Sequence, residues 1–402
     1  MKNFVFISPN FPSNYFHFCR ELKNNGLRVL GIGDSNYEML SSELKASLDE
    51  YYKVDSLENY DSVYKAVAFF SFKYGKIDYL ESNNEYWLEQ DAMLRDDFNI
   101  KTSFHHDDMK YVKFKSKMKE KYALAGIPCA RYYLVESLEG CLDFIKWVGY
   151  PVIAKPDNGV GACGTYKINN EDELKNFMET KGDTLYIMEE YIDGTIISYD
   201  AIVDSFGDPL FETGNVTTFS LLEVVNNLSD SAFYIRKSLP DIVREKGRAV
   251  IRTFGVKSRF VHFEFFCLNR DQYIGKKGDI VALEVNMRPS GGVSPVMMNY
   301  AAGVDVYKIW ADMIAFDKLT HEYDNPHHYC AFVGRRDGLK HKYSADDLRK
   351  KYPGKIVLEE RVEKALSGAM GDYMFLATLD SEEELNNYLN DALSLEEKAE
   401  SI

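Results

Sequence analysis

The sequence predicts an α/β domain at the N-terminus, followed by a larger region of α+β type. The apolar runs NFVFIS (3–8) and LRVLGIGD (27–34) are typical of buried strands, and SNYFHFCRELKNNG (13–26) between them has helical spacing and ends in glycine. Strand, helix and strand in this order indicate a βαβ unit in a parallel sheet. After residue 150 the strands are instead joined by glycine-containing turns, as in VIAKPDNGVGACGTYKI (152–168), which favours hairpins.

Residues 1–110 are expected to form one Rossmann-like domain. The amphipathic segment DSVYKAVAFFSFKYG (61–75) predicts a further helix, and IDYLES (77–82) predicts a further strand. The first loop, from Ser8 to Ser13, contains no Gly-x-Gly-x-x-Gly, so it lacks the glycines that let a pyrophosphate approach the backbone. The domain is therefore predicted to have this architecture without binding a dinucleotide.

The composition is that of an acidic globular protein. Of 402 residues, 45% are hydrophobic and 28% are charged, which supplies ample core material for about two to four domains. The formal net charge of −15 argues against nucleic acid or an anionic membrane as a partner, because both require basic surfaces. The six cysteines are scattered without a Cys-x-x-Cys pair, and no run approaches the ~18 apolar residues of a membrane span. Because the N-terminal apolar run is also too short for a signal peptide, we expect a cytoplasmic protein with reduced thiols.

The same reading of periodicity assigns the rest of the chain to helices and strands. The remaining predicted elements are a basic helix at 111–126, a buried strand at 184–194, a hairpin at 198–216, a helix at 241–255, strands at 259–268 and 279–288, a helix at 300–316, a strand at 329–336 and an acidic, solvated helix at 381–402.

The glycine segment GVGACG (159–164) formally matches Gly-x-Gly-x-x-Gly. That fingerprint must open a helix, whereas here TYKI follows, so a strand–loop–strand is predicted. Such a hairpin can fold over a triphosphate, with its backbone N–H groups directed at phosphate oxygens. Lys155, at the end of the preceding strand, supplies a cation that favours phosphate binding. The alternative is a flexible hairpin that binds no ligand.

Polar side chains share one face of two otherwise apolar strands. Glu264 alternates with apolar residues in VHFEFF, and Glu284 and Asn286 share a face in ALEVN, with Arg288 next on that face. If the two strands pair, two carboxylates and an amide oxygen converge, and these are ligands that suit Mg²⁺. Acidic side chains that face a core are otherwise costly. The alternative is a pair of edge carboxylates that face solvent.

Two further segments carry candidate nucleotide contacts. Lys115 and Lys119 lie one turn apart on the basic helix, and for Lys119 a solvated position is expected. In MEEYI, the backbone of Glu190 and Ile192 offers a carbonyl and an N–H at a strand end, where an adenine edge can be bound. An ordinary strand end is the alternative.

Taken in order, these parts resemble the ATP-grasp superfamily. The resemblance rests on a lysine before AGIP, a lysine before a glycine hairpin, EEYI-DG, HFEFF and LEVNMRPSGG. It is most like the carboxylate–amine ligase and L-amino-acid ligase branch, with biotin carboxylase and carbamoyl-phosphate synthase as relatives. It implies a pre-ATP-grasp domain at 1–110, an ATP-grasp domain at 111–320 and a C-terminal segment at 321–402 that packs on it. The ATP-grasp domain would divide into a nucleotide-binding lobe at 111–190 and a metal-binding lobe at 191–320.

The resemblance also implies roles for individual residues. By position, these are Lys115 and Lys155 for the nucleotide phosphates; Gly159, Gly161 and Gly164 for the flap over them; Glu189, Glu190 and Ile192 for the adenine hinge; Glu264, Glu284 and Asn286 for one or two Mg²⁺ ions; and Arg288 for the acyl phosphate.

Two positions depart from the superfamily pattern. Many relatives carry an acidic residue for the ribose shortly after the hinge glycine, whereas here Thr195 follows Gly194. The position of Lys115 usually follows an aspartate, and here it follows Phe114. The ribose contact is therefore not assigned.

The implied function is an ATP-dependent ligase that activates a small carboxylate as an acyl phosphate and couples it to an amine, with ATP and Mg²⁺ bound and Mn²⁺ able to replace Mg²⁺. Its partners would be small-molecule substrates, and the oligomeric state is left open, with a homodimer among the alternatives. Other readings are a biotin-carboxylase-like or carbamoyl-phosphate-synthase-like enzyme, a Rossmann oxidoreductase and a non-catalytic descendant. Candidates for substrate selection are Glu85, Arg335, Arg336 and the segment 367–371, although for each a surface or structural role is favoured.

Overall fold

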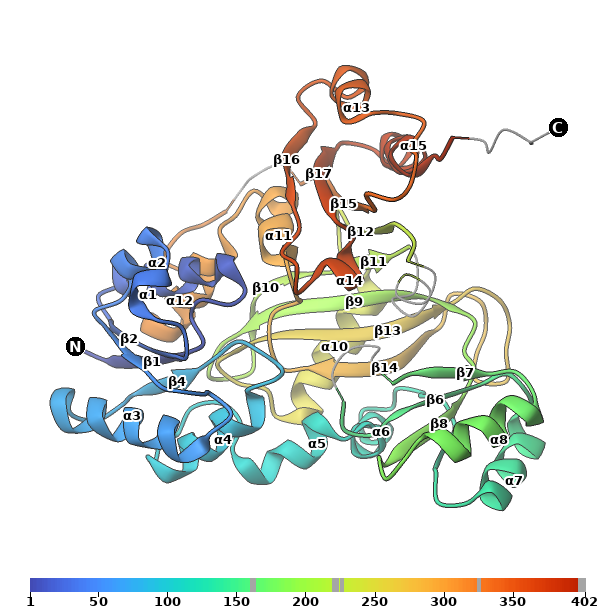
Figure 1. The fold of residues 1–402 in the computed structure, drawn as a ribbon, viewed down its shortest axis with the longest axis horizontal. Coiled ribbons are helices and arrows are strands. Elements are labelled where there is room, and N and C mark those ends of the chain that lie inside the picture. Colours follow the sequence, from blue (N-terminus) through green and yellow to red (C-terminus); the bar gives the residue numbers. More distant parts are fainter. Residues whose placement is uncertain (160–163, 219–223, 225–227, 324–326, 397–402) are drawn as a thin grey trace.

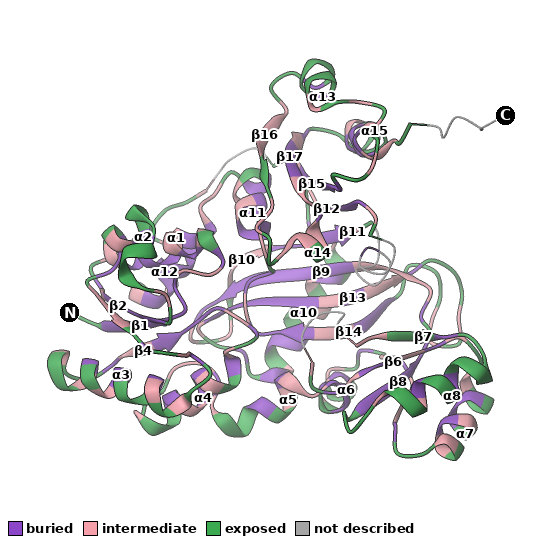
Figure 2. Cartoon of the chain, viewed as in Figure 1, coloured by how far each residue is buried: buried purple, intermediate pink, exposed green. Residues whose placement is uncertain are grey.

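The computed structural model describes the chain except at residues 160–163, 219–223, 225–227, 324–326 and 397–402. The described strands form three sheets. Buried residues, purple in Figure 2, lie along their central strands and on the helix faces that cover them. The prediction of a parallel N-terminal sheet followed by antiparallel sheets is confirmed.

The N-terminal sheet is parallel, with strand order β3-β2-β1-β4. Its strands are β1 (Asn3–Ile7), β2 (Arg28–Gly33), β3 (Glu50–Lys53) and β4 (Tyr79–Glu81). The helices around it are α1 (Phe16–Asn24), α2 (Ser42–Ser47), α3 (Tyr60–Tyr74), α4 (Leu88–Asp97) and, from later in the chain, α12 (Val306–Phe316). Alternation turns Phe4 and Phe6 toward α1 and α12, and it turns Val5 and Ile7 toward α3. The later helix α12 therefore ties this domain to the rest of the molecule.

A small antiparallel sheet forms a separate lobe, with strand order β5-β8-β6-β7. Its elements are β5 (Tyr132–Leu134), α7 (Leu138–Val148), β6 (Val152–Pro156), β7 (Tyr166–Ile168), α8 (Glu171–Thr180) and β8 (Tyr186–Glu190). Strands β6 and β7 pair directly, so the predicted strand–loop–strand around the glycine segment is confirmed and no helix follows it.

The large sheet crosses the centre of Figure 1, with order β14-β13-β9-β11-β12-β15-β17-β16 and β10 paired to β9. Its strands are β9 (Gly194–Val203), β10 (Pro209–Thr213), β11 (Asn215–Thr217), β12 (Ser231–Ile235), β13 (Arg259–Leu268), β14 (Ile280–Asn286), β15 (Tyr329–Arg335), β16 (Ile356–Arg361) and β17 (Tyr373–Leu379). Phe263 and Phe265 pack against α10 (Asp241–Phe254), so the even-numbered side chains of β13 face the opposite side. The strands of the C-terminal segment continue this same sheet.

Three predicted helices differ in the structure. The basic helix is broken at Phe114, whose extended backbone (φ −94°, ψ 118°) separates α5 (Met109–Lys113) from α6 (Lys115–Leu124). The helix predicted at 300–316 is two helices, because α11 (Ser294–Ala302) ends at left-handed Gly303 and the side chain of Asp305 caps α12.

The acidic C-terminal helix is the third difference. It spans α15 (Glu382–Leu393) and is not simply solvated, since it buries Leu385 and Tyr388 in a core shared with β15 and β17. Its predicted continuation beyond residue 396 lies outside the described residues. The remaining helices are α13 (Ala345–Lys351) and the short α14 (Ser367–Met370).

Candidate active site

Strands β13 and β14 bring the predicted polar face together. They pair antiparallel, with Glu264 directly opposite Glu284 and His262 directly opposite Asn286. Directly paired residues point to the same side of a sheet, so all four side chains share one face. The two carboxylates are partly exposed there, at 28% and 19% of the side-chain surface. We call Glu264, Glu284 and Asn286 the carboxylate shelf.

The two shelf carboxylates differ in acidity. Burial raises the pKa of Glu284, and the neighbouring Glu264 adds to this effect against the opposing charge of Lys115. Burial also acts to raise the pKa of Glu264, but His262, Arg288 and Lys155 outweigh it, so this pKa lies below its usual value. Two like charges on one patch repel, and a cation between them would relieve that repulsion.

Lys115 connects the shelf to the glycine segment. Its Nζ lies 3.3 Å from Glu284 Oε1 and donates to the carbonyl of Gly159 at 2.9 Å. The break at Phe114 makes this possible, because α6 begins at Lys115, whose N–H donates to the carbonyl of Asp157 at 2.9 Å. The Asp157 carboxylate also accepts from the N–H and hydroxyl of Ser116, both at 2.7 Å. The end of β6 therefore anchors the first turn of α6.

Lys119 is buried, so its predicted solvated position is wrong. Its Nζ lies 2.7 Å from Glu189 Oε1, and Lys155 Nζ lies 2.8 Å from the other oxygen of the same carboxylate. The pKa of buried Lys155 is raised, because the charges of Glu189 and Glu284 outweigh the opposing effect of burial. The reason the sequence misleads is that α6 packs between the two antiparallel sheets, so that Lys119 lies on its buried side while Lys117 and Glu120 occupy the exposed side of the same turn.

The other two predicted hinge residues, Glu190 and Ile192, also lie in well-defined surroundings. Glu190 binds Arg131 through the backbone N–H at 2.8 Å and through the guanidinium at 2.9 and 2.6 Å. Ile192 is buried in a cluster with Ala130 and Leu268. Binding of adenine by the backbone of this segment stays a prediction. Of the three flap glycines, Gly159 and Gly164 are described, and Gly161 lies outside the described residues.

Arg288 lies where the N-terminal domain meets the shelf. Its Nη2 donates to Asn286 Oδ1 at 3.2 Å, and its Nε lies 3.6 Å from Glu85 Oε2. Glu85 follows β4 and lies 3.6 Å from Lys113 through its other oxygen. Its Oε2 accepts no hydrogen bond from the described residues although it is buried. The N-terminal domain therefore contributes a carboxylate beside the arginine.

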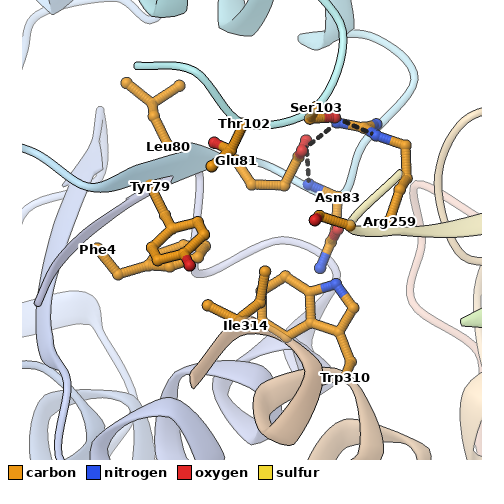
Figure 3. A pocket seen from close by; sticks show the side chains of 11 residues that line it. Phe4, Tyr79, Leu80, Glu81, Asn83, Thr102, Ser103, Arg259, Trp310 and Ile314 are labelled. Atoms are coloured by element: carbon orange, nitrogen blue, oxygen red, sulfur yellow. Dashed lines mark hydrogen bonds and ion pairs between the residues drawn. The ribbon is translucent and has the colours of Figure 1, made fainter. Parts of the chain in front are cut away.

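Sequence reasoning missed Arg259, the first residue of β13. This buried guanidinium donates to the carbonyl of Met287, donates to Ser103 Oγ at 2.6 Å and forms an ion pair with Glu81 of β4. Figure 3 shows Glu81, Ser103 and Arg259 on one side of a small cavity, with Phe4 and Trp310 on the other. The cavity measures about 10 Å³, the space of one water molecule. Because it holds the Met287 carbonyl, Arg259 fixes the backbone between Asn286 and Arg288.

The remaining candidates for substrate selection have structural roles. Arg335 donates to the carbonyls of Ala392 and Tyr343, both at 2.8 Å. Arg336 donates to the carbonyls of Ser367 and Gly368, in the segment proposed to select substrate. Both arginines are buried. Of the two roles favoured for them, structural and surface, the structural one is confirmed.

The donor set fits a hard divalent cation. The shelf offers two carboxylates and an amide oxygen, which matches the preference of Mg²⁺ for one or two carboxylates completed by phosphate and water. In the described part of the chain no three His, Cys, Asp or Glu side chains form a metal-binding cluster, so the amide and outside ligands would be needed. Lys115, Lys155 and Arg288 surround the shelf with positive charge that suits a polyphosphate.

Comparison with known proteins identifies the family. A family model described as "ATP-grasp domain" matches residues 148–296. An L-arginine-specific L-amino acid ligase from Bacillus subtilis is 25% identical over 70% of this chain and 67% of its own length. Residues 148–296 therefore form an ATP-grasp domain. The protein is thus an ATP-grasp ligase, of the class that forms carbon–nitrogen bonds.

Solved structures share the ATP-grasp fold along nearly the whole chain. The L-amino acid ligase from Bacillus licheniformis superposes with a TM-score of 0.72 at 15% identity, covering 99% of each chain. The biotin carboxylase domain of the Hydrogenobacter thermophilus 2-oxoglutarate carboxylase, solved with MgADP and bicarbonate, gives 0.68 at 17% identity, covering 97% of this chain and 89% of that one. These likenesses confirm the fold that the sequence motifs imply. Among its described helices, this ATP-grasp chain has none with the length and apolar character that crossing a membrane requires.

Proposed function

We propose that this protein is a carboxylate–amine ligase, which activates a small carboxylate as an acyl phosphate with ATP and then couples it to an amine. The observation that carries the proposal is the meeting of cations and carboxylates at the shelf, where Lys115 lies 3.3 Å from Glu284. Arg288 binds Asn286 at the other end of the same face. Phosphoryl transfer requires this combination of positioning and charge neutralisation and needs no protein nucleophile.

Each residue has a task in the proposed reaction. Lys115 and Lys155 bind phosphate oxygens of ATP, and the shelf holds Mg²⁺, which when bound neutralises charge on the phosphates. The substrate carboxylate attacks the γ-phosphorus, and ADP leaves. Arg288 stabilises the charge on the acyl phosphate and on the tetrahedral intermediate that forms when the amine attacks the acyl carbon. Phosphate then leaves, and an amide bond remains.

The substrates proposed are amino acids or a short peptide. The support is the sequence likeness to an L-arginine-specific L-amino acid ligase over most of the chain. Glu85 adds a local argument, because its buried Oε2 beside Arg288 has no hydrogen-bond donor among the described residues. An ammonium group on the activated acid would supply such a donor.

The test is phosphate release from MgATP across a panel of acid and amine pairs, with the product detected by mass spectrometry. We expect one or more amino acid pairs to stimulate release, with one amide formed per phosphate. Glu284→Ala should abolish turnover and weaken binding of ATP with Mg²⁺. The ligase proposal fails if no pair stimulates turnover and if Glu284→Ala binds both as well as the wild type.

The second candidate is an enzyme that activates bicarbonate. The observation that supports this alternative is the fold likeness to a biotin carboxylase domain solved with MgADP and bicarbonate. Its signature would be ATP hydrolysis stimulated by bicarbonate in the absence of any amino acid. Stimulation by amino acids alone would decide for the amide ligase.

A further inference from the structure

A buried histidine lies beside the carboxylate shelf, on the same face of the sheet. His262 Nδ1 lies 2.8 Å from Asp200 Oδ1, and His262 Nε2 lies 3.6 Å from Glu264 Oε1. The imidazole therefore lies between two carboxylates, one on β9 and one on its own strand. No step of the proposed ligase reaction uses His262 or Asp200.

Asp200, the partner of His262 Nδ1, is itself held by hydrogen bonds. Asp200 is fully excluded from solvent, and its Oδ2 accepts a hydrogen bond from the hydroxyl of Ser198. That hydroxyl in turn accepts from the backbone N–H of Asn215 at 2.9 Å. Asp200 also stands opposite His262 in the β9–β13 register. Asp200 is thus held by its own hydrogen bonds, and it in turn orients the imidazole through Nδ1.

We propose that His262 is a positioning residue, which holds the carboxylate of Glu264 in the orientation that binds the divalent cation. The proposal rests on the proposed function, because it takes Glu264 to be a metal ligand. With Nδ1 engaged by Asp200, the Nε2 edge faces one oxygen of Glu264 and leaves the other oxygen for the cation. A glutamate side chain has several rotatable bonds, so fixing one of its oxygens reduces the entropy that metal binding must remove. Residues that orient a ligand in this way typically contribute ten- to hundredfold to metal affinity.

The test measures metal binding directly. The probe is Mn²⁺ in the presence of ADP, and bound Mn²⁺ is followed by electron paramagnetic resonance without turnover. We expect His262→Asn, whose short amide cannot reach both carboxylates, to weaken Mn²⁺ binding by about 10–100-fold. In assays with MgATP, the metal concentration for half-maximal rate should rise in parallel, while the rate at saturating metal falls less. His262→Gln, whose amide is longer, should recover part of the affinity.

The chain offers a matched control. His341 Nε2 lies 2.7 Å from Asp230 Oδ2, and both side chains are buried, with His341 exposed to the same 9% as His262. Asp230 directly precedes β12 and His341 follows β15, and in the large sheet β9 and β11 separate these strands from the shelf strands β13 and β14. His341→Asn should lose a comparable amount of stability and bind Mn²⁺ as the wild type does.

The outcomes distinguish a failure of the proposed metal site from a failure of the proposed role of His262. If the wild type does not bind Mn²⁺ with ADP, or if Glu264→Gln binds it unchanged, the metal role of the shelf itself is wrong. If Glu264→Gln weakens binding but folded His262→Asn does not, only the positioning role is overturned. Should His262→Asn fail to fold, Asp200→Asn provides the same test, since it keeps the shape of the anchor and removes its charge. Unchanged Mn²⁺ affinity in Asp200→Asn would also overturn the inference.

Discussion

Lys119 Nζ and Glu189 Oε1 lie 2.7 Å apart in a pair from which water is almost excluded. Lys155 reaches the second oxygen of the same carboxylate at 2.8 Å. One buried negative charge therefore holds two positive charges, and the local excess is positive. This excess is suited to a polyphosphate, and it makes Glu189 a structural requirement of the site.

Glu189→Gln should be strongly destabilising. The change leaves two buried ammonium groups without their carboxylate, and breaking a buried pair in this way costs about 3–5 kcal/mol. Urea denaturation at neutral pH measures the loss in unfolding free energy. Asp143→Asn is the control, because its pair with Lys146 is exposed and its removal should cost less than about 1 kcal/mol. Equal losses in the two variants would refute the prediction.

The contribution of Glu189 should depend on pH. Burial acts to raise the pKa of this carboxyl, but Lys119 and Lys155 outweigh burial and lower the pKa from 4.5 to about 2. A carboxyl with a depressed pKa stabilises the fold above its unfolded pKa and loses that contribution as the pH falls toward its folded pKa. The difference in unfolding free energy between wild type and Glu189→Gln should therefore be full at neutral pH and shrink below about pH 5. Denaturation curves at several pH values check this, and a constant difference would contradict it.

The contact between Glu81 and Arg259 should couple the N-terminal domain to the shelf. Arg259→Met breaks the ion pair with the buried Glu81 carboxylate and leaves that carboxylate only Arg95, 3.6 Å away, which should cost up to about 3–5 kcal/mol of unfolding free energy. The double variant Glu81→Gln with Arg259→Met should be less destabilised than the sum of the two single variants. A double-mutant cycle by urea denaturation measures this coupling, and strictly additive losses would show that the pair does not interact.

Asp157→Ala should affect both stability and nucleotide binding. It removes the acceptor for Ser116 at the start of α6, which should cost about 0.5–2 kcal/mol, and it frees Lys115 from its anchored turn. We therefore expect a raised KM for ATP. Asn170→Ala, which removes the cap of α8, is the matched control and should lower stability with KM unchanged. A KM that rises equally in both variants would count against this role of Asp157.

Much of the fold was predictable because it depends on local pattern. The alternation in VHFEFF and ALEVN was enough to expect paired strands with Glu264, Glu284 and Asn286 on one face, and β13 and β14 pair in this way. The break at Phe114 was not predictable from helical spacing, because it depends on Asp157, which lies 43 residues from Phe114 in the sequence and accepts from the first turn of α6. Arg259 and Glu81 could not be linked from the sequence, since the two strands belong to different sheets.

The sequence by itself determined which strands alternate, where the turns lie and which side chains are available on one face, because these features depend on periods of two and 3.6 residues. Only the tertiary structure decided what those side chains meet. Lys119 looks like a solvated lysine on an amphipathic helix, yet packing between two sheets places it against Glu189. His262 looks like one more residue of a buried strand, yet the register with β9 brings it to Asp200. The physical reason is that burial and charge pairing depend on distances between distant segments, which no local period encodes.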